Sequence, residues 1–217
     1  KAPSEILEES LPGLQFGVLS GPTFAGEVAA GKPTAVSLAL PKALKNAQYY
    51  QEAFSNASMR CYLSSDVRGS ELGGTLKNIY AIGAGMCDGL ELGDNAKAAY
   101  LTRSLNELLR VGTAMGGNSE TFHGLSGFGD LIATCSGEWS RNRTFGQHVG
   151  QGKTAESIIG KQKTVVEGYR ATKCVKQYCE QEKIDAPILS TIHAVLYQGL
   201  LPQEGIHALM NRRLSTE

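Results

Sequence analysis

A lysine that follows two glycines is the first residue of this sequence whose surroundings could support chemistry. Lys77 lies in the segment GGTLKN (73–78), inside a helical pattern and one residue away from its apolar stripe. It therefore flanks the buried face of the predicted helix, and the glycines leave room for a ligand beside it. A lysine in a partly dry site can have a lowered pKa, which makes it usable as a general acid or base. Spacing alone also allows a solvated surface lysine.

A carboxylate that could serve this lysine comes later in the chain. Asp130 directly follows the glycine turn in GFGDLIAT (127–134), and a helix would place it on one face with Thr134. Such a carboxylate could pair with Lys77 and orient it. An aspartate that simply begins a helix would have the same sequence.

The segment SRNR (140–143) gathers groups that suit an anion. Ser140 is predicted to cap a helix, and the first turn of a helix attracts phosphate. Arg141 and Asn142 would add a guanidinium fork and an amide donor. We interpret the segment as a local phosphate site, with a solvated basic turn as the alternative.

A second glycine-rich segment, GAGMCDGLELGDN (83–95), has two interpretations. Gly83 and Gly85 could belong to a nucleotide-binding loop, but a helix and not a strand precedes them. The other interpretation is a helix that ends in a glycine-rich turn, with Asn95 capping the next helix.

Composition limits the class of protein. The chain has 217 residues, 41% of them hydrophobic, which is enough for one large domain or two small ones. Its 21 basic and 21 acidic residues argue against a nucleic-acid partner or broad binding to an anionic membrane. We expect neither a transmembrane segment nor a signal peptide, because apolar stretches are short and the first ten residues are polar. Five cysteines without CxxC or zinc spacing indicate no metal site and a reducing, cytoplasmic location.

The elements predicted around these segments form two regions. Residues 1–68 alternate strands with helical stretches, which predicts a parallel α/β sheet. The strands are expected at 16–20, 34–40 and 59–63, and the helices at 23–30 and 41–55. Residues 69–217 have helical periodicity almost throughout, with apolar stripes beginning at Leu72, Leu101, Ala171 and Ile188 and a last helix from Pro202.

The glycine pattern GxGxxG of a dinucleotide-binding unit does not occur in this sequence. We therefore expect residues 1–68 to be the C-terminal remnant of a Rossmann-like α/β domain whose N-terminal half is absent. A mostly α-helical C-terminal domain, 69–217, would carry the substrate and catalytic residues.

Several segments together resemble the NAD(P)-dependent glycerol-3-phosphate dehydrogenases, especially their bacterial biosynthetic branch. They are GTLKNIYAIGAGMCDGLELGDN (74–95), SGPTFA (20–25), GFGDLIATC (127–135), SRNR (140–143) and VVEGYR (165–170). They follow the family order over almost the whole chain. Tyr80 departs from the pattern, because an aliphatic residue is usual there, and we expect this to matter only for packing.

The resemblance implies a role for individual residues. Lys77 would be the catalytic lysine. The implied substrate-binding residues are Gly21, Thr23, Lys77, Asp130, Ser140, Arg141 and Asn142, the implied cofactor-binding residues are Ala25, Arg141, Val165 and Glu167, and Asn78 and Thr134 would be active-site neighbours.

The implied reaction interconverts dihydroxyacetone phosphate and sn-glycerol 3-phosphate with NAD or NADP, and would supply glycerophospholipid synthesis. The family's cofactor loop and a second substrate lysine would precede Lys1, so we expect the isolated chain to be inactive. The sequence decides neither NAD against NADP nor whether the chain forms a homodimer. Two alternatives are another two-domain hydroxyacid or sugar-phosphate dehydrogenase, and a non-enzymatic substrate-binding or oligomerisation fragment.

Overall fold

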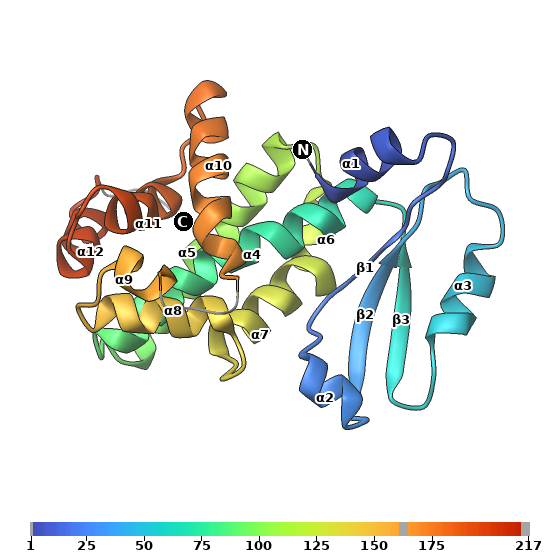
Figure 1. The fold of residues 1–217 in the computed structure, drawn as a ribbon, viewed down its shortest axis with the longest axis horizontal. Coiled ribbons are helices and arrows are strands. Elements are labelled where there is room, and N and C mark those ends of the chain that lie inside the picture. The colour runs from blue at the N-terminus through green and yellow to red at the C-terminus, as the bar shows by residue number, and fades with distance from the viewer. Residues whose placement is uncertain (1, 161–164, 214–217) are drawn as a thin grey trace. The chain divides into compact units, whose positions relative to one another are not determined.

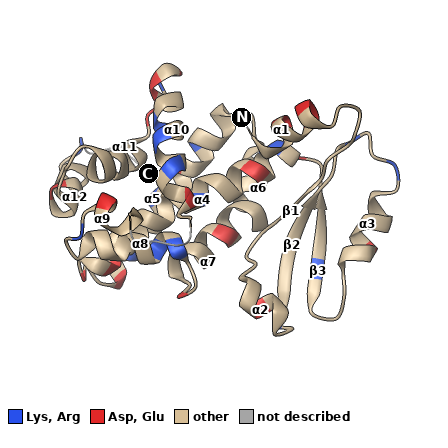
Figure 2. Cartoon of the chain, viewed as in Figure 1, with Lys and Arg blue, Asp and Glu red and all other residues tan. Residues whose placement is uncertain are grey.

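The structure is a computed structural model that describes residues 2–160 and 165–213. The chain divides into two compact units, one made of residues 1–77 and 108–133, the other of residues 78–107 and 134–217. The long helices α4 (Val67–Gly89) and α5 (Asp94–Ala114) and the short α7 (Asp130–Ser136) contribute residues to both units. Figure 2 shows basic and acidic positions interspersed along the elements, as the balanced composition predicts.

The first unit contains a small mixed sheet (Figure 1). Its remaining elements are α1 (Pro3–Ser10), β1 (Val18–Ser20), α2 (Ala25–Ala29), β2 (Thr34–Ala39), α3 (Ala47–Phe54), β3 (Met59–Ser64), α6 (Ser119–His123) and the π-helix η1 (Leu125–Gly129). Strands β2 and β3 pair in parallel, with Val36 opposite Cys61. The expected parallel arrangement is therefore confirmed for these two strands.

The expectation is wrong for β1, which runs antiparallel to β2, with Leu19 opposite Leu38. A parallel connection must travel back along the length of the strand, usually through a helix within a crossover of a dozen or more residues. The helix between β1 and β2, α2, has only five residues. The chain instead reverses after Ser20, at Gly21, whose φ of +141° suits glycine.

One face of the sheet forms an apolar core with α3. Val36, Leu38, Leu40 and Cys61 are buried, and Ala47 at the start of α3 packs against them. The helix expected at 41–55 is shorter than predicted, because residues before Ala47 form turns.

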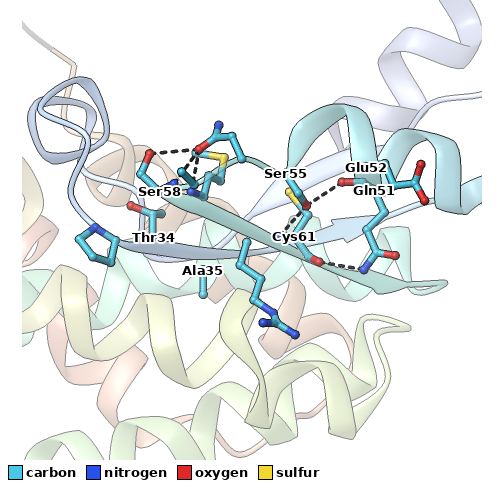
Figure 3. Close-up of a pocket in the computed structure, with 12 residues that line it drawn as sticks. Thr34, Ala35, Gln51, Glu52, Ser55, Ser58 and Cys61 are labelled. Atoms are coloured by element: carbon cyan, nitrogen blue, oxygen red, sulfur yellow. Dashed lines mark hydrogen bonds between the residues drawn. The ribbon is translucent and has the colours of Figure 1, made fainter.

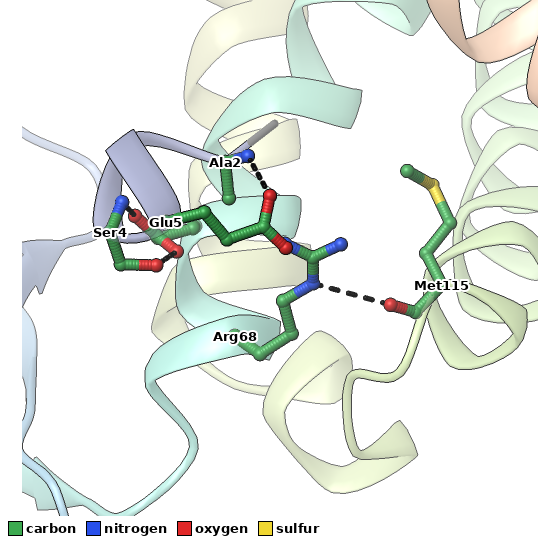
Figure 4. A network of polar contacts seen from close by, with 6 residues as sticks. Ala2, Ser4, Glu5, Arg68 and Met115 are labelled. Atoms are coloured by element: carbon green, nitrogen blue, oxygen red, sulfur yellow. Dashed lines mark hydrogen bonds and ion pairs between the residues drawn. The ribbon is translucent and has the colours of Figure 1, made fainter. Parts of the chain in front are cut away.

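A helix that the sequence analysis did not predict, α1, is attached to the beginning of α4 (Figure 4). The Glu71 carboxylate accepts hydrogen bonds from Ser4 N at 2.7 Å and Ser4 Oγ at 2.5 Å. Arg68 pairs with Glu5 at 3.0 Å and donates through Nε to the carbonyl oxygen of Met115. These charge-assisted bonds compensate for α1 having no fully buried residue.

The second unit is helical. Its complete helices are α8 (Arg141–Gly150), α9 (Ala155–Ile159), α10 (Glu167–Gln181), α11 (Pro187–Tyr197) and α12 (Pro202–Met210). Within it, α4 and α8 approach so closely that glycines form the contact. A Cβ on Gly85 would lie 1.9 Å from the carbonyl oxygen of Arg143, and one on Gly146 would lie 1.8 Å from that of Ile82. Gly85 and Gly89 therefore serve helix packing, whereas Gly93 lies in the turn after α4 with a φ of +83°. The nucleotide-loop interpretation is wrong.

A buried carboxylate holds the start of α11 in this unit. Glu107 is almost fully buried and accepts hydrogen bonds from the backbone N–H groups of Ile188 and Leu189, both at 2.8 Å. The Tyr80 hydroxyl also donates to it, at 3.4 Å, and burial together with the Glu107 charge raises the pKa of Tyr80 well above its usual value. Glu107 thus satisfies amides that would otherwise be unpaired at a helix end.

The predicted apolar stripes agree with burial in α4 and largely in α11, but Leu101 and Leu105 of α5 are only half-buried and Met210 of α12 is 78% exposed. Leu72, Leu76 and Ile79 of α4 are buried, as are Ile188 and Ile192 of α11. Cys174 was expected on a buried stripe but is exposed, because α10 buries Gly168, Thr172, Val175 and Cys179 instead.

Candidate active site

Lys77 and Asp130 form an ion pair in the first unit. Lys77 Nζ lies 2.5 Å from Asp130 Oδ1, and the two side chains are 19% and 5% exposed. The surface-lysine alternative for Lys77 is therefore wrong. A nearly buried carboxylate attracts the ammonium group and fixes its direction, while the remaining exposure lets a small molecule reach it.

The position of Asp130 depends on the π-helix that precedes it. In η1 the N–H of Gly129 bonds to the carbonyl oxygen of Gly124, five residues earlier. Close packing holds this turn: a Cβ on Gly127 would lie 2.1 Å from the carbonyl oxygen of Phe122, and one on Gly73 would lie 2.1 Å from that of Ser126. The glycine before Lys77 in the helix thus lets η1, and with it Asp130, approach α4.

Of the two glycines before Lys77, only one is needed for this approach. A Cβ on Gly74 would meet nothing nearer than Ser20 Oγ, at 3.7 Å. The free space expected beside Lys77 is therefore found at Gly74, whereas Gly73 is in tight backbone contact.

The remaining candidates of the first unit lie at the turn after β1. Gly21 is buried, and a Cβ there would approach the carbonyl oxygen of Ala35 to 3.3 Å. Thr23 is exposed and donates its hydroxyl to the carbonyl oxygen of Gly21 at 3.1 Å. Ala25 is the exposed first residue of α2. A side chain at Gly21 would thus disturb this turn.

The phosphate-site candidates of the second unit begin with a helix cap. Ser140 is buried, and its Oγ accepts a hydrogen bond from Arg143 N at 3.2 Å, so the predicted N-cap of α8 is confirmed. Arg141, the first residue of α8, forms an ion pair with Glu167, the first residue of α10. Their side chains are 50% and 44% exposed, so both charged groups are accessible to a ligand.

Asn142 is buried and bonded to three partners. Its Nδ2 donates to Asn78 Oδ1 at 3.0 Å and to Glu167 Oε2 at 3.4 Å, and its Oδ1 accepts from Gly168 N at 2.9 Å. A Cβ on Gly168 would lie 2.4 Å from the carbonyl oxygen of Asn78. The Asn142 amide therefore ties α4, α8 and α10 together at the point where Arg141 and Glu167 meet.

The start of α10 is also supported by a row of rings. Tyr169 contacts Phe145 edge-on and Tyr197 at 4.7 Å between ring centroids, and His193 lies beside Tyr197. The Tyr197 hydroxyl donates to the carbonyl oxygen of Tyr169 at 2.5 Å, and burial raises the pKa of Tyr197. These contacts fix the backbone two residues after Glu167. Val165, the remaining cofactor-site candidate, is exposed just before the helix.

Sequence reasoning missed one residue that supports this cluster. Asp88, near the end of α4, accepts from Arg143 Nε at 2.6 Å and from Lys97 Nζ at 2.7 Å. It therefore holds the first turn of α8 through the second arginine of SRNR. The signal available in the sequence was an acidic residue within the glycine-rich packing segment.

Two hollows in the first unit are lined by residues other than the site candidates described above. The larger, about 700 Å³, lies at the amino ends of β2 and β3 (Figure 3). On its wall, Gln51 Nε2 donates a hydrogen bond to the carbonyl oxygen of Cys61, and Ser55 Oγ accepts one from Cys61 N. The smaller, about 500 Å³, lies between β2, β3 and the α6–η1 segment.

Among the helices of residues 2–160 and 165–213, none has the length and apolar character needed to cross a membrane.

Comparisons with known proteins identify the family of this chain. A family model described as the C-terminus of NAD-dependent glycerol-3-phosphate dehydrogenase matches residues 66–207, and the corresponding N-terminus model matches residues 1–47. A Francisella tularensis protein named glycerol-3-phosphate dehydrogenase (NAD(P)+) is 44% identical over 99% of this chain, and the chain spans 64% of its length.

Solved structures give the same family. The Coxiella burnetii glycerol-3-phosphate dehydrogenase is 38% identical, with a TM-score of 0.88 over 96% of this chain and 64% of that chain. The Saccharomyces cerevisiae enzyme is 27% identical, with a TM-score of 0.83 over 94% of this chain and 62% of that one. The chain belongs to the NAD-dependent glycerol-3-phosphate dehydrogenase family.

Proposed function

We propose that this chain carries the catalytic and substrate-binding residues of an enzyme that interconverts dihydroxyacetone phosphate and sn-glycerol 3-phosphate. The observation that carries the proposal is the Lys77–Asp130 ion pair, in which a nearly buried carboxylate holds a partly exposed ammonium group. Membership of the dehydrogenase family supports this reaction over other hydroxyacid or sugar-phosphate substrates, and over a binding module without activity.

Lys77 acts as the acid and base. NAD or NADP, when bound in reduced form, supplies the hydride for the ketone carbon. As the carbonyl bond becomes a single bond, its oxygen takes up the proton that Lys77 Nζ donates. Before that transfer, the ammonium charge stabilises the negative charge that develops on the oxygen. In the oxidative direction neutral Lys77 accepts the hydroxyl proton, while Asp130 keeps the amine in place.

Arg141 and the first turn of α8 bind the phosphate group. A half-exposed guanidinium beside a capped helix start is a suitable anion site. Holding the phosphate fixes the orientation of the ketone, so the energy of binding the phosphate is used to align the reacting carbon with the hydride donor. The half-exposed Arg141 and Glu167 also have charges that suit the phosphate and ribose hydroxyl groups of a dinucleotide. These residues therefore fit the cofactor that the family uses.

The test uses the enzyme encoded by the complete open reading frame that contains this chain. Replacing Lys77 with Ala should lower kcat by at least about a hundredfold, the range of general acid–base catalysis. Lys173→Ala, at an exposed lysine of α10, is the matched control and should leave kcat unchanged. If Lys77→Ala keeps kcat within about tenfold, or about 1.4 kcal/mol of barrier, the acid–base role is wrong.

We further propose that the enzyme works in the cytoplasm, where it supplies glycerophospholipid synthesis, and that it forms a homodimer. The five free cysteines support a reducing compartment. Cell fractionation and the molar mass in solution test these two points.

A further inference from the structure

The carboxylate of Glu167 occupies the donors that the proposed phosphate site needs. Its Oε1 is paired with Arg141 Nη2, and its Oε2 accepts from Asn142 Nδ2 at 3.4 Å. Arg141 and Asn142 are the first two residues of α8 and are the side chains assigned to the substrate phosphate. An internal anion is thus bound where an external anion is expected.

The two anions cannot share these donors without repulsion. A phosphate ester bound to Arg141 would lie beside the Glu167 carboxylate, and two like charges within a few ångströms disfavour each other. Binding of one therefore requires the other to withdraw. We propose that Glu167 is an internal competitor of the substrate phosphate, which must displace this carboxylate from Arg141. The inference rests on the proposed function.

The contacts show which partner can move. Asn142 is buried and keeps its bonds to Asn78 and to the N–H of Gly168 when Glu167 leaves. Arg141 and Glu167 are half-exposed, and an exposed ion pair is weak and easily exchanged. The Asn142 frame therefore remains in place while the glutamate side chain turns away.

The released carboxylate has a favourable position close by. Glu167 is the first residue of α10, and the partial positive charge of a helix start stabilises an acidic side chain there. Tyr169 is fixed by its ring contacts and by the Tyr197 hydroxyl, so the backbone stays still during the exchange. A rotation of the Glu167 side chain alone can thus open the site.

Calorimetric titration of the enzyme from the complete open reading frame with inorganic phosphate and with glycerol 3-phosphate tests the competition. Glu167→Gln removes the negative charge and keeps the side-chain size, so both ligands should bind about tenfold more tightly than to the unchanged enzyme. Glu156→Gln, at an exposed acidic residue in the first turn of α9, changes the net charge equally and should leave both affinities unchanged. Arg141→Ala should weaken both ligands. Circular dichroism checks that each variant is folded.

The outcomes separate the inference from the proposed function. If phosphate binds through Arg141 but Glu167→Gln binds it equally or more weakly, Glu167 positions the arginine and the competition is wrong. If Glu156→Gln increases the affinity for phosphate as much as Glu167→Gln does, the increase comes from net charge alone, and the inference is also overturned. If neither the unchanged enzyme nor Glu167→Gln binds phosphate ligands, both the anion site and the competition are rejected. The Lys77→Ala experiment does not depend on these results.

Discussion

The proposed chemistry depends on a single pair of side chains, Lys77 and Asp130. The carboxylate is almost completely buried and faces an ammonium group that is only partly exposed. Removing one member of such a pair leaves the other charge poorly compensated. Replacing either residue should therefore lower both the free energy of unfolding and kcat.

Asp130→Asn tests this coupling in the enzyme from the complete open reading frame. The amide keeps the size of the side chain but removes its charge, so Lys77 loses its partner. We expect kcat to fall by at least about tenfold and the free energy of unfolding to fall by about 3 kcal/mol. Steady-state kinetics and urea denaturation measure the two effects. Asp94→Asn, at the exposed start of α5, should leave kcat unchanged and lower the free energy of unfolding by less than about 1 kcal/mol. Unchanged turnover in Asp130→Asn would show that Lys77 needs no orienting carboxylate.

Helix packing is the principal structural feature at the scale of elements. Helices α4 and α8 meet through Gly85 and Gly146, each of which faces a carbonyl oxygen of the other helix. Added methyl groups there would force the helices apart, and this movement would also disturb the first turn of α8, where Arg141 and Asn142 lie. The glycines therefore support the proposed anion site without belonging to it.

Gly146→Ala should lower the free energy of unfolding by about 3 kcal/mol, because its Cβ would lie 1.8 Å from a backbone oxygen. Gly74→Ala is the matched control in α4, where the added carbon has space. It should raise stability by about 0.5–1 kcal/mol, since alanine restricts the unfolded chain. Thermal or urea denaturation compares the two. Equal effects would mean that helix contact is not what selects glycine at position 146.

Local sequence signals predicted the features that depend on a few neighbouring residues. Ser140 is predicted as a cap because the cap rule joins residues three positions apart. The pairing of Asp130 with Lys77 rests on complementary charge, since the two residues lie far apart in the sequence and no local pattern joins them. The reversal of β1 depends on the length of α2 relative to the sheet, which periodicity does not reveal. Likewise, Glu107 caps α11 from 81 positions away, so no local pattern could have assigned it.

At the scale of the whole molecule, the thiols are distributed unevenly. Cys174 is exposed, whereas Cys61, Cys87, Cys135 and Cys179 are buried. Burial raises the pKa of Cys87 and of Cys179 to about 11, so at pH 8 both are almost entirely in the unreactive thiol form. A molecule with five free cysteines thus presents a single accessible one.

Labelling with a thiol reagent at pH 8 should modify one cysteine quickly in the folded chain and all five after denaturation. The fast phase should disappear in Cys174→Ser. Raising the pH toward 11 should speed the reaction of Cys87 and Cys179, because the thiolate fraction grows as the pH approaches a raised pKa. Rapid modification of more than one thiol at pH 8 would contradict the burial of the other four.

The π-turn before Asp130 has a consequence for how this family can change. Each residue of a helix advances the next side chain by about 100°, and a π-turn holds one more residue than an α-turn of the same length. Deleting one residue from Leu125–Gly129 would relax the turn into a regular helix and swing the carboxylate away from the lysine. Small shifts can accommodate point mutations in the turn except at Gly127, where an added Cβ would lie 2.1 Å from the carbonyl oxygen of Phe122. We therefore expect strict selection on the chain length of this segment and on the glycine at position 127.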